Sequence, residues 1–270
     1  MAKVIRLKIS QDNQEKVNGF REALFSQVQQ FLFEFVPLKI QQMDDLLKFS
    51  CTSLHSLQLI NILLKDWSPK LHCILKSDLF NVEDLATLHT ELNIPIPDPP
   101  TEESEDSSKM ETDKEEKKAP RCGFLKENEK LQNVLNTVQP EIRRLREGCA
   151  LIITWIHHLI PKIEDGNDFG VSVQEKLVER VTAVKTKVET TQTNISKYFS
   201  ERGDVVAKAS KETHVMDYRA LVHEKDEITF VDLKIAFTEV RNFYVEIFDI
   251  ILKNFEKITN PKGDEKSSMY

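Results

Sequence analysis

Apolar side chains recur at steps of three and four residues through most of this chain, and this spacing predicts long amphipathic helices. The pattern is clearest on both sides of the short segment Pro161–Gly170. A helix cannot continue through Pro161, and Gly166, Asn167 and Gly170 accept backbone angles that other residues resist. The segment is therefore expected to connect two antiparallel helices. The apolar positions before it are Ile142, Leu145, Cys149, Ile152, Ile156 and Leu159, and those after it are Val173, Leu177, Val181, Val184, Val188, Thr191, Ile195 and Phe199.

The first and the last helix of the chain are predicted in the same way. The first should run from about Gln11 to Lys48, with a kink at Pro37. Its apolar arc is wide enough to be buried on two sides, against the core and against a neighbouring subunit. The last should end at Asn260-Pro261. The stripe of the first helix is Val17, Phe20, Leu24, Val28, Phe31 and Phe35, and that of the last is Leu233, Phe237, Val240, Tyr244, Ile247, Ile251, Phe255 and Ile258.

The ends of the two middle helices are predicted from capping residues and from breakers. The second helix should begin near Asn128 and be kinked at Pro140. Ser172–Glu175 has the form of a capping box, which would start the third helix there. Gly203 would end that helix. Leu131, Val134, Leu135 and Val138 are expected on the buried face of the second helix.

The remaining stretches divide the chain into five regions. Helix 1 occupies 1–48, and an atypical, Leu-rich and Ile-rich insert with its connection occupies 49–94. A Pro-rich and then highly charged linker, 95–120, has too few apolar side chains to offset the entropy of ordering, so it is expected to be disordered. Helices 2–4 occupy 121–260, with the 161–170 loop between helices 2 and 3, and 261–270 is expected to be a flexible tail.

Composition supports an all-α chain and excludes several function classes. Only 7 of 270 residues are Gly while 30% are charged, which favours long helices over a turn-rich β architecture. The net charge of −7 argues against nucleic-acid binding. The longest apolar run, Cys149–Ile160, is too short to span a membrane, and Met1–Ser10 lacks the apolar core of a signal peptide.

No cofactor or metal site is expected from the sequence. The four cysteines form no CxxC pair, and the adjacent His157 and His158 point about 100° apart on a helix. The segment from Asp165 opens like a calcium loop, but Phe169 and Lys176 stand at positions that need oxygen ligands. An acidic surface turn is the plainer interpretation.

Several long runs of sequence resemble the eleven-S proteasome activator (REG) family. They are Pro161–Val171, then Gln174–Lys176, then Ile195–Asp204. The run Lys211–His223 and the ending Met269-Tyr270 resemble the beta-type subunits of that family most closely. The resemblance covers 1–48 and 79–270, and 49–77 departs from the pattern.

The resemblance implies a fold, a function and two sets of site residues. The fold is a four-helix bundle of long antiparallel helices that assembles into a seven-membered ring with alpha-type subunits. The ring binds the outer (alpha) ring of the 20S proteasome without ATP, opens its gate and stimulates peptide hydrolysis, which supports antigen processing. The expected location is the cytoplasm, and the nucleus is left open as a second compartment. The implied activation loop includes Gly166, Asn167, Asp168 and Phe169, and the implied proteasome-binding C-terminus is Ser268, Met269 and Tyr270, whose carboxylate meets a lysine of the partner.

Two other functions compete with this interpretation. A helical-bundle scaffold or adaptor of the cytosol would need neither the loop nor the C-terminal segment. A hydrolase would need Glu164, Asp165 or Asp168 to act with a His or Cys, and no such residue stands nearby in a recognisable motif. The sequence therefore predicts a protein that is not an enzyme.

Overall fold

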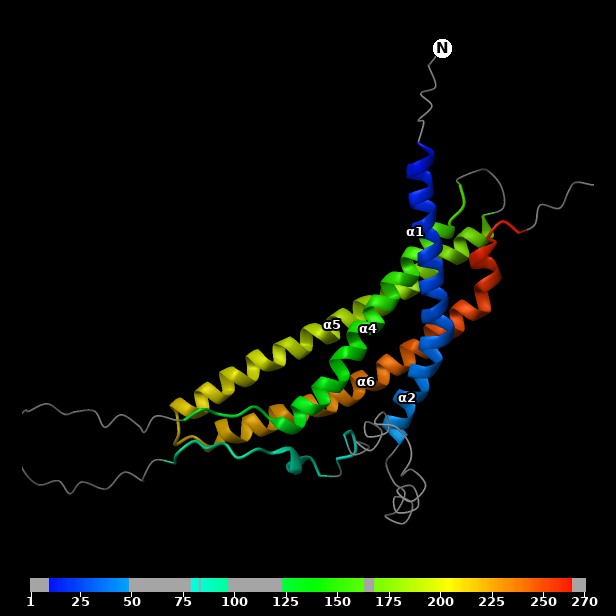
Figure 1. Ribbon diagram of the computed structural model, residues 1–270. Helices are drawn as coiled ribbons and strands as arrows, with labels where there is room; N and C mark the ends of the chain where they lie inside the picture. Colours follow the sequence, from blue (N-terminus) through cyan, green and yellow to red (C-terminus); the bar gives the residue numbers. More distant parts are fainter. Residues whose placement is uncertain (1–9, 49–78, 83, 97–122, 163–167, 264–270) are drawn as a thin grey trace, which may run out of the picture. The chain divides into compact units, whose positions relative to one another are not determined.

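The computed structural model describes residues 10–48, 79–82, 84–96, 123–162 and 168–263. Every regular element in these ranges is helical, so the prediction of an all-α chain is confirmed for them (Figure 1). No helix in these ranges carries an apolar stretch long enough to cross a membrane. The elements are α1 (Gln11–Gln30), the π-helix η1 (Phe31–Phe35), α2 (Val36–Lys48), the 3-10 helix η3 (Leu85–Leu88), α4 (Glu129–Leu159), α5 (Phe169–Lys211) and α6 (Met216–Thr259).

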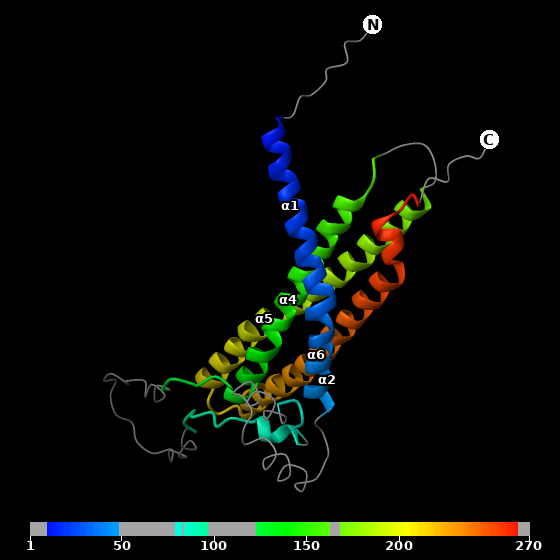
Figure 2. The same ribbon diagram turned by 45° about the vertical axis from the view of Figure 1, so that its right-hand side comes forward.

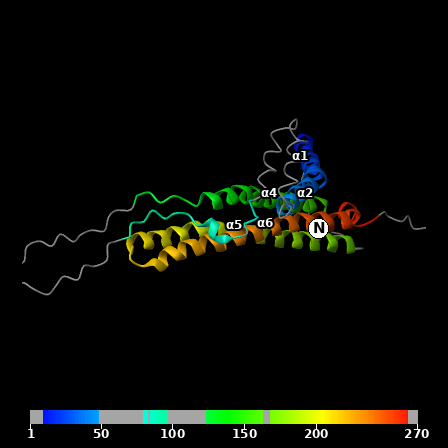
Figure 3. The same cartoon turned by 90° about the horizontal axis from the view of Figure 1, so that it is seen from below.

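The chain divides into two compact units, each built from segments that are distant in sequence. Unit 1 consists of Met1–Asn81, Thr137–Thr193 and Lys234–Tyr270. Unit 2 consists of Val82–Asn136 and Asn194–Leu233. The helices α4, α5 and α6 each contribute to both units, and Figure 3 shows α5 and α6 side by side.

The helix predicted over Gln11–Lys48 contains a π turn, Phe31–Phe35, shortly before Pro37. The N–H of Val36 bonds the carbonyl of Phe31, five residues back, and not the one four residues back. Because Pro37 lacks an N–H and its ring crowds the preceding turn, a wider turn upstream accommodates it. From the π turn onward Leu32, Val36 and Met43 are buried, whereas Phe31 and Phe35 of the predicted stripe are only half-buried. Before the π turn Leu24 and Val28 are buried as predicted, but Val17 and Phe20 of the same stripe are exposed.

Aromatic side chains join this helix to α4 and α6 within unit 1. The rings of Phe31 and Phe35 stack at 5.4 Å, and both lie against Tyr244, at 6.5 and 6.2 Å. A Cβ atom at position 148 would lie 2.0 Å from the ring of Phe31, so only Gly148 lets the ring approach α4 this closely. Ion pairs flank the aromatic contacts, Lys39 with Glu141 at 2.7 Å and Arg241 with Asp44 at 2.8 Å.

The predicted stripes of α4 and α6 form the core of the bundle. Leu131 through Ile156 of the α4 stripe are buried, as is the α6 stripe with the exception of Phe255. The start of α4 also matches the prediction, because the side chain of Asn128 accepts a hydrogen bond from the N–H of Leu131 at 3.2 Å. Pro140 lies inside α4, which continues through it.

Both predicted ends of the third helix are wrong. The N–H of Ser172 bonds the carbonyl of Asp168 at 2.9 Å, so Ser172 already lies in the first turn of α5 and does not cap it. At the other end, Gly203 lies inside α5, which continues to Lys211. The continuation is stabilised by tertiary packing, since Val205 and Ala209 beyond this glycine are buried. On the same helix Tyr198, not Phe199, belongs to the core.

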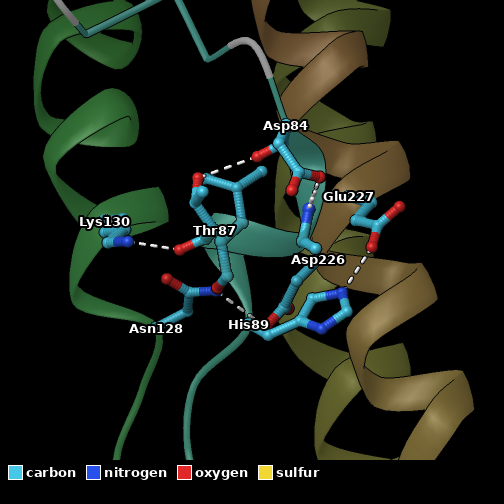
Figure 4. A network of polar contacts seen from close by, with 9 residues as sticks. Asp84, Thr87, His89, Asn128, Lys130, Asp226 and Glu227 are labelled. Atoms are coloured by element: carbon cyan, nitrogen blue, oxygen red, sulfur yellow. Dashed lines mark hydrogen bonds and ion pairs between the residues drawn. The ribbon is translucent and has the colours of Figure 1, made fainter.

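In unit 2 a strap, defined here as residues 84–96, is held against α4 and α6 by polar contacts (Figure 4). The fully buried Asp226 accepts hydrogen bonds from Asn128 at 2.9 Å, from the hydroxyl of Tyr198 at 2.7 Å and from Arg202 at 2.8 Å. The amide of Asn128 also donates to the carbonyl of Leu88 in the strap, at 2.9 Å. A buried carboxylate is stable only when it is paired and hydrogen-bonded, and Asp226 meets both conditions.

Two histidines meet where the strap crosses α6. The ring of His89 stacks on that of His223 with 4.3 Å between centroids, and His89 also contacts the carboxylate of Glu227. Burial lowers the pKa of His223, and positive charge on His89 lowers it further, while Asp226 and Glu227 act in the opposite direction and Arg202 adds to the lowering. The Nδ1 atom of His223 is buried without a hydrogen-bond partner among the described residues, so a proton on it would find no acceptor there.

Acidification is expected to loosen the strap. Because the folded pKa of His223 lies below its ordinary value of about 6.5, the strap-bound form takes up fewer protons than the released form. Strap binding is therefore complete above about pH 6.5 and weakens as the pH falls below it. Hydrogen–deuterium exchange of 84–96, corrected for the intrinsic effect of pH, should be faster at pH 5.5 than at pH 7.5. His223→Gln should remove this difference, whereas the same change at the exposed His214 should keep it.

Candidate functional site

Of the predicted site residues, Asp168 and Phe169 lie at the end of unit 1 where α4 ends, α5 begins and α6 ends (Figures 1 and 2). Gly166 and Asn167 fall in 163–167, and Ser268, Met269 and Tyr270 fall in 264–270, so these five lie outside the described residues. Asp168 directly precedes α5 and is exposed. Phe169 is the first residue of α5 and is 67% exposed.

The two feet of the loop are helix ends with well-defined hydrogen bonding. On the α4 side, the N–H of Ile160 bonds the carbonyl of Ile156 at 3.2 Å, and Pro161 then prevents continuation. On the α5 side, the carbonyl of Asp168 begins the helix by accepting from Ser172. The described backbone thus leaves α4 after Leu159 and enters α5 at Phe169.

Gln174 connects these ends to the end of α6. Its side chain is fully buried, and its Nε2 donates to the carbonyl of Leu159 at 3.2 Å and to the carbonyl of Ile258 at 2.7 Å. Carbonyls in the last turn of a helix have no partner within the helix, and an outside donor satisfies them. A single amide therefore binds the last turns of α4 and α6 from the beginning of α5.

Gly170 allows the chain leaving α6 to touch the first turn of α5. A Cβ atom at this position would lie 1.9 Å from the carbonyl oxygen of Pro261, which is far inside van der Waals contact. The sequence suggested that Gly170 serves a turn, but it is helical, and the described glycine with a positive φ is Gly263, at 70°. A glycine is needed at position 170 so that the backbone at Pro261 can lie directly against the first turn of α5.

A shallow groove of about 360 Å³ runs beside this junction between α5 and α6. Phe169 lies at one end of it, and Lys176 and Arg180 add positive charge. Arg180 pairs with Glu246 of α6, which raises the pKa of the guanidinium, so Arg180 stays charged. The other lining residues are Ser172, Val173, Leu177, Ile250 and Asn254.

The described residues offer no catalytic constellation at this end. Of the three carboxylates considered for hydrolysis only Asp168 is described, and no described residue hydrogen-bonds its side chain. Cys149 is fully buried, and burial raises its pKa to about 12, so its thiol is not a nucleophile. Among the residues described, no cluster of three or more His, Cys, Asp or Glu side chains could hold a metal ion.

Family models match most of the chain. The C-terminal model of proteasome activator PA28 matches residues 124–268, and the N-terminal model of proteasome activator PA28 matches residues 11–64 and 69–99. The chain belongs to the proteasome activator PA28 family. The N-terminal match covers the segment 49–77 apart from 65–68, so most of the stretch that the sequence analysis treats as an insert is matched by the family model.

Relatives of known sequence or structure match this chain along nearly its whole length. The chain is 52% identical over 271 residues to proteasome activator complex subunit 2 from Bos taurus, with 100% of both chains covered. The fold is similar to that of the 11S subunit of the Plasmodium falciparum proteasome, PA28, with a TM-score of 0.68, 23% identity and coverage of 97% and 100%. It is also similar to that of a chain in the crystal structure of an archaeal 20S proteasome in complex with a mutated P26 activator, with a TM-score of 0.55, 13% identity and coverage of 95% and 99%.

The sequence reasoning missed the structural roles of Gln174 and Gly170 at this junction. Gln174 stands between the predicted core positions Val173 and Leu177, yet it is more buried than either. A polar side chain next to the apolar stripe, within one turn of a helix start, is the signal that could have indicated a helix-end contact. Gly170 gave no such signal, because Pro261 is distant in sequence.

Proposed function

We propose that this chain is a subunit of a ring that binds the end of the 20S proteasome, opens its gate without ATP and stimulates peptide hydrolysis. The observation that carries the proposal is the 52% identity, over the full length of both chains, to a subunit of a proteasome activator complex. The chain acts as a regulator and is not an enzyme. Its place of action is the cytoplasm, where it supports antigen processing.

Apolar surface on unit 1 supports assembly with other subunits. Val17 and Phe20 of α1 are 51% and 56% exposed, and Phe33 and Leu38 are also exposed. Ile235, Val245 and Leu252 are exposed on α6. Large apolar patches on a soluble protein mark interaction surfaces, and head-to-tail contacts that close make a ring. The proposed ring has seven members, with alpha-type subunits next to this chain.

The direct test measures assembly and activity together. The purified chain, alone and mixed with an alpha-type partner, is examined by native mass spectrometry and is then added to the 20S proteasome with a fluorogenic peptide and no ATP. We expect a heptameric mass in the mixture and a faster release of fluorophore. A persistent monomer in both samples, or a ring that leaves hydrolysis unchanged, would favour the alternative of a helical scaffold or adaptor.

Within the proposed function, binding and activation belong to different residues. The segment Ser268–Tyr270 is assigned to binding, as a chain end that enters a pocket of the partner. Several such tails on one ring act at high effective concentration, and avidity of this kind exceeds single-site affinity by about 10²–10⁴. The loop residues Gly166, Asn167, Asp168 and Phe169 are assigned to gate opening.

Deleting Met269 and Tyr270 is expected to weaken binding of the ring to the 20S proteasome by about 10²-fold or more, because every tail loses its anchor at once. Surface plasmon resonance with immobilised 20S proteasome measures the change. Hydrolysis should recover when the concentration of the ring is raised, since the loop is intact. Unchanged affinity after the deletion would remove the tail from the binding role.

A further inference from the structure

Gln174 lies at the junction of the two segments on which the proposed function depends. Leu159, whose carbonyl it binds, is the last residue of α4 and immediately precedes the loop. Ile258, whose carbonyl it also binds, is the penultimate residue of α6, and the chain continues from there into the C-terminal tail. Gln174 itself belongs to the beginning of α5, a few residues after the loop.

The geometry at Gln174 resists independent movement of these ends. Its amide is fully buried, and one nitrogen serves two carbonyls that belong to the ends of two long helices. Separating either end would leave a buried carbonyl without the donor that satisfies it, which is unfavourable. The Oε1 atom of Gln174 is also buried, without a hydrogen-bond partner among the described residues.

The contact at Gly170 fixes the same junction from a second side. The carbonyl of Pro261 occupies the space where a side chain at position 170 would stand, so the exit of α6 lies directly on the first turn of α5. The turn closes with a hydrogen bond from the N–H of Gly263 to the carbonyl of Asn260 at 3.2 Å. Both feet of the loop and the root of the tail are thus parts of one packed unit.

We propose that Gln174 is a positioning residue. It fixes the two helix ends that flank the 161–170 loop, at Leu159 and Phe169, relative to the start of the C-terminal tail at Pro261. The inference rests on the proposed function and deepens it. When the tail binds the proteasome, the position of the loop is determined by the path from the tail through α6 and Gln174 to the ends of α4 and α5. Gln174 acts through these helix ends and does not itself touch the partner.

Gln174→Met tests the inference, because methionine has a similar length and helix preference but no donor. Rings of this variant should bind the 20S proteasome with the affinity of the wild type. At saturating ring concentration they should stimulate peptide hydrolysis about fivefold less or worse, the lower end of typical couplings between sites. The measurement pairs a binding isotherm with the maximal rate of fluorogenic peptide hydrolysis.

A matched variant controls for structural effects. Gln192→Met makes the same change elsewhere on α5, where the amide accepts a hydrogen bond from Arg146 of α4 at 3.0 Å, and it should keep full maximal stimulation. Equal maximal stimulation by the Gln174→Met ring and the wild type would overturn the inference.

Measuring ring assembly and the activity of the wild-type ring distinguishes a failure of this inference from a failure of the proposed function. A wild-type ring that does not stimulate hydrolysis contradicts the proposed function itself. A wild-type ring that stimulates, together with a Gln174→Met chain that does not assemble by native mass spectrometry, overturns only the positioning role, because the residue would then maintain the fold.

Discussion

Rings that carry Asn167→Tyr in every loop are expected to bind the 20S proteasome normally and to lose stimulation of peptide hydrolysis. A loop can favour an open gate only through contacts that differ between the open and the closed state. If the side chain of Asn167 makes that contact, a bulky aromatic ring at this position removes it. The tail is unchanged in this variant, so the affinity should be unchanged as well.

A second substitution separates this role from turn chemistry. Asparagine is a good turn former, and glycine is at least as good, so Asn167→Gly keeps the turn and removes only the side chain. Asn167→Gly should therefore also lose stimulation. Asn194→Tyr, at an exposed position in the middle of α5, is the matched control and should stimulate normally. Normal stimulation by bound Asn167→Tyr rings would refute the role assigned to the loop.

The largest effect on stability is expected at Asp226. Asp226→Asn keeps the shape of the side chain but removes its charge, which leaves Arg202 without its carboxylate partner in a site where Asp226 is fully buried. Breaking a buried ion pair by removing one partner costs about 3–5 kcal/mol. The hydroxyl of Tyr198, whose pKa is raised by burial and by this hydrogen bond, also loses its anionic acceptor.

Thermal unfolding followed by circular dichroism measures this loss, at the same assembly state for all variants. The matched control is Asp232→Asn, at an exposed position of α6, which should stay within about 0.5 kcal/mol of the wild type. Hydrogen exchange should locate the loss in unit 2, which contains Asp226, the strap and their partners. Similar melting temperatures for Asp226→Asn and Asp232→Asn would show that the buried pair does not stabilise unit 2.

Helices and their buried faces were largely predictable, because the spacing of apolar residues is local information. The stripes of α4 and α6 were identified correctly, and the ends of the first predicted helix coincide with the start of α1 and the end of α2. Where local signals competed with tertiary packing they failed: Gly203 did not end α5, and Ser172 did not start it. The exposure of Val17 and Phe20 could not be predicted either, because the spacing of apolar residues shows that a helix face is apolar but not which element covers it.

The sequence by itself determined the helical content, the apolar stripes and the family resemblance from which the loop and the tail were assigned. All of these depend on residues that lie close together in the sequence. The tertiary structure alone decided which polar groups are buried and what they hold together. Gln174 meets the carbonyl of Ile258 across 84 residues, and Asn128 meets Asp226 across 98. No periodicity in the sequence can report such contacts, because they depend on how helices distant along the chain pack against one another.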